Sequence, residues 1–175
     1  GDLGTLRRVQ RALALSSQLS LALFFHAGQD AVVETHPEDK LQPLFFAQAS
    51  DAASWHNLPV PSVPEENGFH KIEASCGLTF LLYPFGKEDK DQGWVVAGPV
   101  SERPLHAEEK AGLADIFQVD VADIEEAITH HPSPVPLDLG YISEILETLA
   151  DLAVHLCAER RQRARDLMVL RSLYE

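Results

Sequence analysis

The chain has 175 residues, of which 45% are hydrophobic, and this size and composition suit one globular domain with a substantial core. It carries 27 acidic and 14 basic residues, a formal net charge of −13. So negative a surface repels phosphate backbones and anionic lipids, which makes nucleic acid and membrane surfaces poor partners.

The two cysteines, Cys76 and Cys157, form no disulfide framework and favour a reducing, cytoplasmic compartment. The longest apolar run, residues 21–25, is far shorter than the roughly 20 residues that span a bilayer. No signal peptide is visible, but the chain begins at Gly1 without a methionine. We therefore expect a piece of a longer protein.

The N-terminal part predicts a helix followed by a hairpin. Apolar residues at helical spacing predict a helix over residues 3–20. Two short apolar runs, residues 21–25 and 31–35, flank a Gly-containing turn and predict a β-hairpin.

The middle of the chain predicts one short helix, one long loop and three strands. Residues 40–50 predict a short helix that Pro43 breaks. Residues 54–68 contain three prolines and no usable period, and they predict a long irregular loop of a kind that is often functional. Three strands are then expected, over residues 69–74, 77–85 and 93–100.

The C-terminal part predicts only helices, over residues 106–117, 121–130 and 138–175. The last would be a rod of roughly 55 Å if it were continuous. The order of elements predicts an α+β fold, a PAS- or GAF-like antiparallel sheet of about five strands flanked by helices, with a long C-terminal helix.

The C-terminal helix carries a heptad pattern. Its mainly apolar seam repeats at alternating steps of four and three residues, and two arginines interrupt it in the middle. The seam residues are Ile142, Leu146, Leu149, Ala153, Leu156, Arg160, Arg163, Leu167, Leu170 and Tyr174. One interpretation is a helix packed on its own domain up to about Cys157 and then solvated. The other is a coiled-coil homodimer through Leu149, Leu156, Leu167 and Leu170. We accordingly divide the chain into a domain of residues 1–157 and a signalling helix of residues 158–175.

The sequence offers little for catalysis. Its eight histidines make no His-Glu-x-x-His motif, and there is no Cys-x-x-Cys pair, phosphate-binding glycine loop or dinucleotide fingerprint. His70 and Cys76, six residues apart along a strand, would lie roughly 20 Å from each other. We therefore expect neither an enzyme nor a metal or cofactor.

Aromatic residues suggest a binding pocket instead. Tyr83 and Trp94 fall on neighbouring predicted strands, and Trp55 falls in the irregular loop. Such residues most often fill a core, but a sheet face under a loop also encloses mostly apolar ligand pockets with a few polar groups. The candidate ligand-binding residues are Trp55, His70, Cys76, Tyr83, Trp94 and His26.

Three segments carry a resemblance to a known family. Residues 75–78 (Ser-Cys-Gly-Leu), 82–85 (Leu-Tyr-Pro-Phe) and 93–100 (Gly-Trp-Val-Val-Ala-Gly-Pro-Val) resemble the PocR-type sensory domain, a PAS- and GAF-like module. The resemblance covers about residues 6–156. It implies a sensor of small organic molecules joined to a transcription factor, a histidine kinase or a cyclic-dinucleotide enzyme. Many relatives carry several cysteines before the Cys/His-x-Gly-Leu element, whereas residues 50–72 contain none. Any function of that cysteine cluster therefore does not carry over, and only Cys76 remains, by position, as a pocket residue.

Three functions follow. The first is a cytoplasmic sensor whose bound ligand changes the pose of the terminal helices and so acts on an output domain. The second is a dimerisation module that binds no ligand. The third and weakest is redox sensing by Cys76. The ligand, the output domain, the direction of regulation and any membrane segment elsewhere in the natural protein cannot be read from this sequence.

Overall fold

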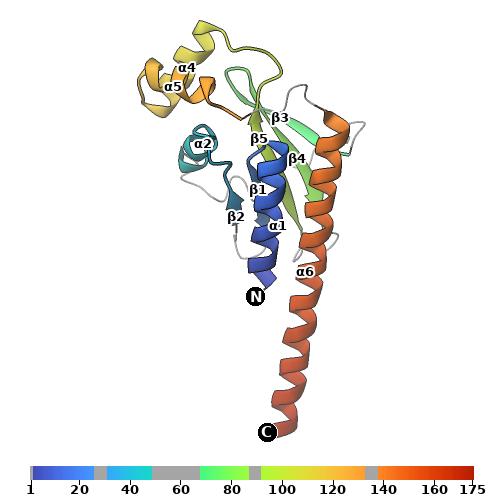
Figure 1. Ribbon diagram of the computed structural model, residues 1–175. Coiled ribbons are helices and arrows are strands. Elements are labelled where there is room, and N and C mark those ends of the chain that lie inside the picture. The colour runs from blue at the N-terminus through green and yellow to red at the C-terminus, as the bar shows by residue number, and fades with distance from the viewer. Residues whose placement is uncertain (1, 26–30, 49–67, 87–91, 133–137) are drawn as a thin grey trace.

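The computed structural model describes residues 2–25, 31–48, 68–86, 92–132 and 138–175. A five-stranded antiparallel sheet in the order β2-β1-β5-β4-β3 forms its centre (Figure 1). The strands are β1 (Leu21–Phe25), β2 (Ala31–Glu34), β3 (His70–Ser75), β4 (Leu78–Phe85) and β5 (Gly93–Val100). The predicted α+β fold is confirmed, and each strand lies within one residue of its predicted bounds.

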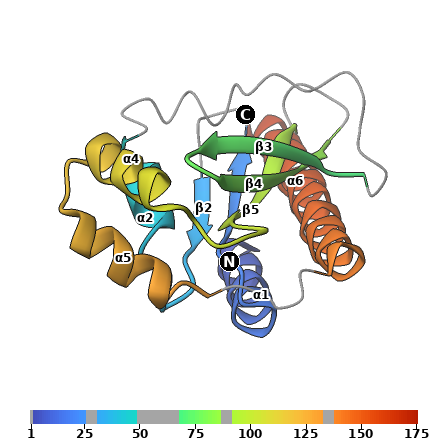
Figure 2. The ribbon, with the colours of Figure 1, turned by 90° about the horizontal axis from the view of Figure 1, so that it is seen from above.

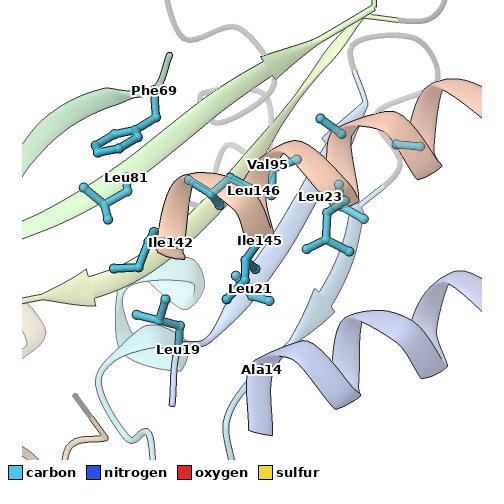
Figure 3. Packing of buried hydrophobic residues seen from close by; sticks show 14 of the residues in the cluster. Ala14, Leu19, Leu21, Leu23, Phe69, Leu81, Val95, Ile142, Ile145 and Leu146 are labelled. Carbon is cyan, nitrogen blue, oxygen red and sulfur yellow. The ribbon is translucent and has the colours of Figure 1, made fainter. Parts of the chain in front are cut away.

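One face of the sheet is covered by the two terminal helices, α1 (Asp2–Ser17) and α6 (Leu139–Tyr174) (Figure 1). Figure 3 shows Ile142, Ile145 and Leu146 of α6 lying over Leu81 and Val95 of the sheet. All five are at most 5% exposed. We call this side the α6 face, and it holds the largest hydrophobic cluster in the described part of the chain.

Helix α1 ends earlier than the predicted residue 20. Gln18 adopts a left-handed conformation with φ of 58°, and the Leu19 N–H donates to the carbonyl of Ala14 at 3.2 Å. This is the pattern of a Schellman C-cap, which terminates a helix and turns the chain into the next element.

The opposite face of the sheet, which we call the α2 face, lies under α2 (Gln42–Gln48). The prediction that Pro43 breaks this helix is wrong. Pro43 is the second residue of α2, in the first turn, where a backbone N–H has no partner within the helix and its absence costs nothing. Phe45 and Phe46 of α2 contact Phe80 edge-to-face and stacked, with ring centroids 5.3 and 6.2 Å away.

Helices α4 (Ala107–Phe117) and α5 (Val121–Thr129) pack on each other beyond the start of β4. Their cluster contains Leu113, Phe117 and Ile124, with Leu41 and Leu78 from the rest of the chain. Figure 2 shows α4 and α5 on the same side of the sheet as α2, whereas α6 lies on the other side.

The two halves of helix α6 have different surroundings. Its first half is core, with Leu149 and Ala153 both 0% exposed. From Gln162 to Glu175 every residue is exposed, and the helix extends away from the sheet (Figure 1). The predicted dimer seam therefore needs one correction, because Leu149 contacts its own sheet and is not available to a second copy. Leu156 is half-buried, and Leu167 and Leu170 are 62% and 51% exposed.

Candidate functional site

Two of the six predicted ligand residues, His70 and Trp94, lie together on the α2 face. His70 begins β3, Trp94 is the second residue of β5, and β4 runs between them. Their rings meet edge-to-face at 79°, with centroids 6.0 Å apart. Both residues are buried, at 4% and 1% exposure. A polar ring and an indole thus share one apolar environment on this face of the sheet.

The indole N–H of Trp94 is the notable feature of this pair. Its neighbours on the sheet are apolar, among them Phe24, Phe80 and Leu82. Within the part of the chain that the structure describes, Nε1 is buried and has no hydrogen-bond partner. An unpaired buried donor costs about 1–3 kcal/mol. A ligand with a carbonyl, hydroxyl or ring nitrogen would accept this hydrogen bond and recover that energy.

Tyr83 lies on the other face of the sheet. It is paired with Val95 of β5, whereas Trp94 is paired with Pro84, and successive residues of a strand point to opposite faces. Tyr83 packs against the cluster under α6. Partial burial, followed by the negative charges of Glu147 and Asp151, raises the pKa of the Tyr83 hydroxyl above 10.0. Tyr83 and Trp94 therefore do not line one pocket.

Cys76 lies at the tip of the β3–β4 hairpin. Cys76 and Gly77 have φ of 52° and 83°, as the two central residues of a tight type I′ turn require. The half-buried thiol faces α4, since a Cβ added to Gly112 would lie 2.8 Å from its Sγ. Leu78 and Pro84, the residues of β4 nearest Cys76 and Trp94, are roughly 20 Å apart along the strand. The structure thus separates Cys76 from His70 and Trp94.

His26 and Trp55, the remaining predicted ligand residues, lie outside the described residues. The long loop expected at residues 54–68 falls there as well, except for Gly68. Their part in the site stays a prediction, as does redox sensing by Cys76.

A buried polar network, which the sequence did not predict, joins four segments that are distant in the chain. The Ser20 hydroxyl donates to Asp39 Oδ2 at 2.5 Å, and Asp39 Oδ1 accepts the N–H groups of Leu41 and Gln42 at 2.9 and 3.0 Å. His131 Nδ1 lies 3.3 Å from the same Oδ1. Its Nε2 lies 2.7 Å from the carbonyl oxygen of Pro99.

The surroundings of His131 favour the charged form of its ring. The ring lies between two acceptors, the Asp39 carboxylate and the Pro99 carbonyl, and a ring with a proton on both nitrogens suits both of them. Burial alone would lower the pKa of His131, but contact with the Asp39 carboxylate and the Pro99 carbonyl outweighs it and raises that pKa above 6.5. Burial alone would likewise raise the pKa of Asp39, but hydrogen bonds from His131, Ser20 and the Gln42 backbone lower it below 3.8.

A cavity of about 420 Å³ lies beside this network. It is bounded by the start of β4, the segment 101–105, the last turn of α5 and the residue before α2. Its lining residues are Leu41, Leu78, Ser101, Glu102, Arg103, Pro104, Leu105, Ile128 and His131. None of the six predicted ligand residues is among them.

Neither the network nor the cavity has a local sequence signal. Asp39 and His131 are far apart in the chain, and no motif pairs them. The run His130-His131-Pro132 shows two adjacent histidines, but nothing in it indicates which one is buried. Only the folded chain brings His131 to Asp39.

Among the described residues, no three His, Cys, Asp or Glu side chains gather in a way that could hold a metal ion. None of the helices in those same ranges is long and apolar enough to cross a membrane.

Comparison with known proteins gives no relative to reason from. No family model matches the chain, and neither a curated protein nor a solved structure is detectably similar to it.

Proposed function

We propose that this chain is a sensory domain that binds a small organic molecule on the α2 face, at His70 and Trp94, and relays the bound state through α6. One observation carries the proposal. Trp94 and Val95 are consecutive residues of β5, and Trp94 holds the unpaired indole N–H on one face while Val95 packs in the cluster under α6 on the other. A ligand that shifts β5 changes the surface on which α6 rests.

The resemblance to the PocR-type sensory domain supports this proposal, since such domains act on a covalently linked output domain. The proposal includes a cytoplasmic location and an output domain outside this chain, a transcription factor, a histidine kinase or a cyclic-dinucleotide enzyme. A ligand needs only to bind two poses of α6 with different affinity, and a difference of a few kcal/mol shifts their populations.

We also propose that the exposed part of α6 pairs with the α6 of a second copy. Six large apolar side chains are exposed within its last eight residues, between 51% and 90%, namely Leu167, Met168, Val169, Leu170, Leu173 and Tyr174. Leu167, Leu170 and Tyr174 continue the heptad seam of the buried half of the helix. A dimer would bury this apolar surface. In such a dimer, a change in the pose of α6 would also change the distance between the two output domains.

Native mass spectrometry of the purified protein tests ligand binding. We expect an additional mass for each protomer, or else a thermal shift with a member of a metabolite library. Trp94→Phe keeps an aromatic ring but lacks the N–H, so we expect it to bind that molecule about tenfold more weakly, the value of one hydrogen bond.

Tyr83→Phe is the matched control, because it also removes one polar hydrogen from an aromatic ring but lies on the α6 face. We expect its affinity to equal that of the wild type. Equal loss in both variants, or full affinity in Trp94→Phe, would argue against the proposed site.

The alternative function is a dimerisation module without a ligand. It is favoured by the close packing of the α2 face, where Phe24, Phe80, Leu82 and Trp94 are each at most 4% exposed. A dimer that carries no additional mass and shows no thermal shift with any library compound would select this alternative.

A further inference from the structure

The cavity beside the Asp39–His131 pair is large enough for a ligand of its own. Its volume of about 420 Å³ lies within the range of roughly 300–1,000 Å³ that small-molecule sites occupy. It is formed by segments that meet only in the folded chain, which are Leu41, Leu78, residues 101–105, Ile128 and His131.

The charged groups of the lining are all neutralised by neighbours within the protein. His131 lies 3.3 Å from Asp39, Glu102 lies 3.0 Å from Lys71, and Arg103 lies 2.6 Å from Glu109. The Ser101 hydroxyl donates to the carbonyl of Arg103. The cavity therefore offers no unbalanced charge, and a charged molecule would lose its hydration without gaining a counter-ion.

The rest of the wall is apolar. Leu41, Leu78 and Leu105 are 1%, 1% and 8% exposed, and half-buried Ile128 and exposed Pro104 complete it. A molecule of matching shape would remove this apolar surface from water, which contributes about 25 cal/mol for each Å².

We propose that this cavity binds an uncharged, mainly apolar small molecule. The site is separate from His70 and Trp94, since Leu78 begins β4 while Pro84, opposite Trp94, stands near its other end. The inference does not depend on the function proposed above. Because the cavity joins α5 to the start of β4, its occupant would link the α4–α5 pair to the sheet.

Three probes of one shape but different charge test the proposal, namely benzyl alcohol, benzoate and benzylammonium. Methyl NMR spectra of the full chain are recorded during titration with each probe. We expect benzyl alcohol to cause saturable shifts at the methyl groups of Leu41, Leu78, Leu105 and Ile128. The two charged probes should bind at least tenfold more weakly. Equal binding of all three, or no saturable shift at these methyls, would overturn the proposal.

Ile128→Trp fills the cavity and should weaken benzyl alcohol binding at least tenfold. Leu15→Trp, at a side chain 48% exposed on α1, is the matched control and should bind as the wild type does. If Ile128→Trp does not fold, Leu105→Phe replaces it with a smaller increase in volume. Undiminished binding in a folded filling variant would overturn the proposal.

The position of the shifts separates this site from the one on the α2 face. Benzyl alcohol that shifts only Ile72 and Leu82, which lie near His70 and Trp94, would reject the cavity and leave the proposed sensory site standing. Shifts confined to the cavity methyls support the cavity whatever the fate of the sensory site.

Discussion

The buried ion pair between Asp39 and His131 connects the entry to α2 with the end of α5. Their side chains are 1% and 8% exposed, and removing one partner of a buried pair leaves the other charge without compensation. We expect His131→Gln to lower the free energy of unfolding by about 3 kcal/mol near pH 6.

The same pair gives the stability a defined pH dependence. The folded-state pKa of His131 is raised above 6.5, so its contribution is complete below that value and is lost as the pH rises through the folded pKa. The pKa of Asp39 is lowered below 3.8, so its contribution is present above 3.8 and is lost as the pH falls through the folded pKa. The difference between wild type and His131→Gln should therefore peak between these limits.

Urea denaturation at a series of pH values measures this difference. His155→Gln is the control, because His155 is paired with Glu159 at 3.2 Å but its side chain is 69% exposed. An exposed pair of this kind contributes less than about 1 kcal/mol. A loss in His131→Gln that stays constant from acid to alkaline pH would show that the pair is not ionic.

The candidate site was only partly predictable from the sequence. The residue types of His70 and Trp94 marked both as candidates, and the structure places them together. Tyr83 was grouped with Trp94 because both were expected beside one hairpin turn, but a register change of one residue moves a side chain to the other face. The sequence does not determine that register, so it could not exclude Tyr83.

At the scale of single elements, Gly93 shows how closely β5 is packed between its neighbours. A Cβ at this position would lie 2.2 Å from the carbonyl oxygen of Phe24 and 2.4 Å from the ring of Phe85. The carbonyl oxygen of Phe24 belongs to the backbone, so it cannot move away by a side-chain rotation. We expect Gly93→Ala to lower the free energy of unfolding by about 3 kcal/mol, the upper range for overpacking.

Gly4→Ala is the matched substitution. A Cβ at Gly4 meets no atom within 4 Å, and Gly4 lies within α1, so alanine should raise the stability by about 0.5–1 kcal/mol. Thermal unfolding of both variants checks the pair. An unchanged stability in Gly93→Ala would mean that β1 and β4 can separate at little cost.

The helices followed from their hydrophobic periods, whereas the strands followed from short apolar runs between turns, because β1 and β5 are buried on both faces. Their ends followed less well, since an end depends on single residues. The left-handed Gln18 that stops α1 has no sequence signal like that of glycine. A proline can either interrupt a helix or occupy its first turn. The position of Pro43 as the second residue of α2 decides for the first turn.

At the scale of the whole molecule, the main ambiguity was the partner of the heptad seam. A repeat of apolar residues suits packing on a sheet as well as packing on a second helix, so the sequence left both interpretations open. The structure assigns Ile142, Leu149 and Ala153 to the sheet. Leu167 and Leu170 are exposed, because no other element in the described part of the chain covers them.

Substitution of both leucines by glutamate tests the proposed dimer. We expect the double variant Leu167→Glu, Leu170→Glu to sediment as a monomer under conditions in which the wild type is a dimer, because four like charges would face one another in the interface. The stability of the dilute monomer should change by less than about 0.5 kcal/mol, since both sites are exposed.

Leu15→Glu, on α1 and 48% exposed, is the control and should leave the dimer intact. Analytical ultracentrifugation distinguishes the species. A wild-type chain that is monomeric at every accessible concentration would contradict the proposed dimer.

The unbroken length of α6 gives it a mechanical property. The helix packs on the cluster beneath it as far as Leu156 and is a single element to Tyr174, so its free arm is about 27 Å long at 1.5 Å per residue. A tilt of about 10° at the sheet would swing the far end of that arm through about 5 Å. A displacement at β5 too small to break any core contact thus becomes, at the other end of the lever, a movement as large as one turn of helix.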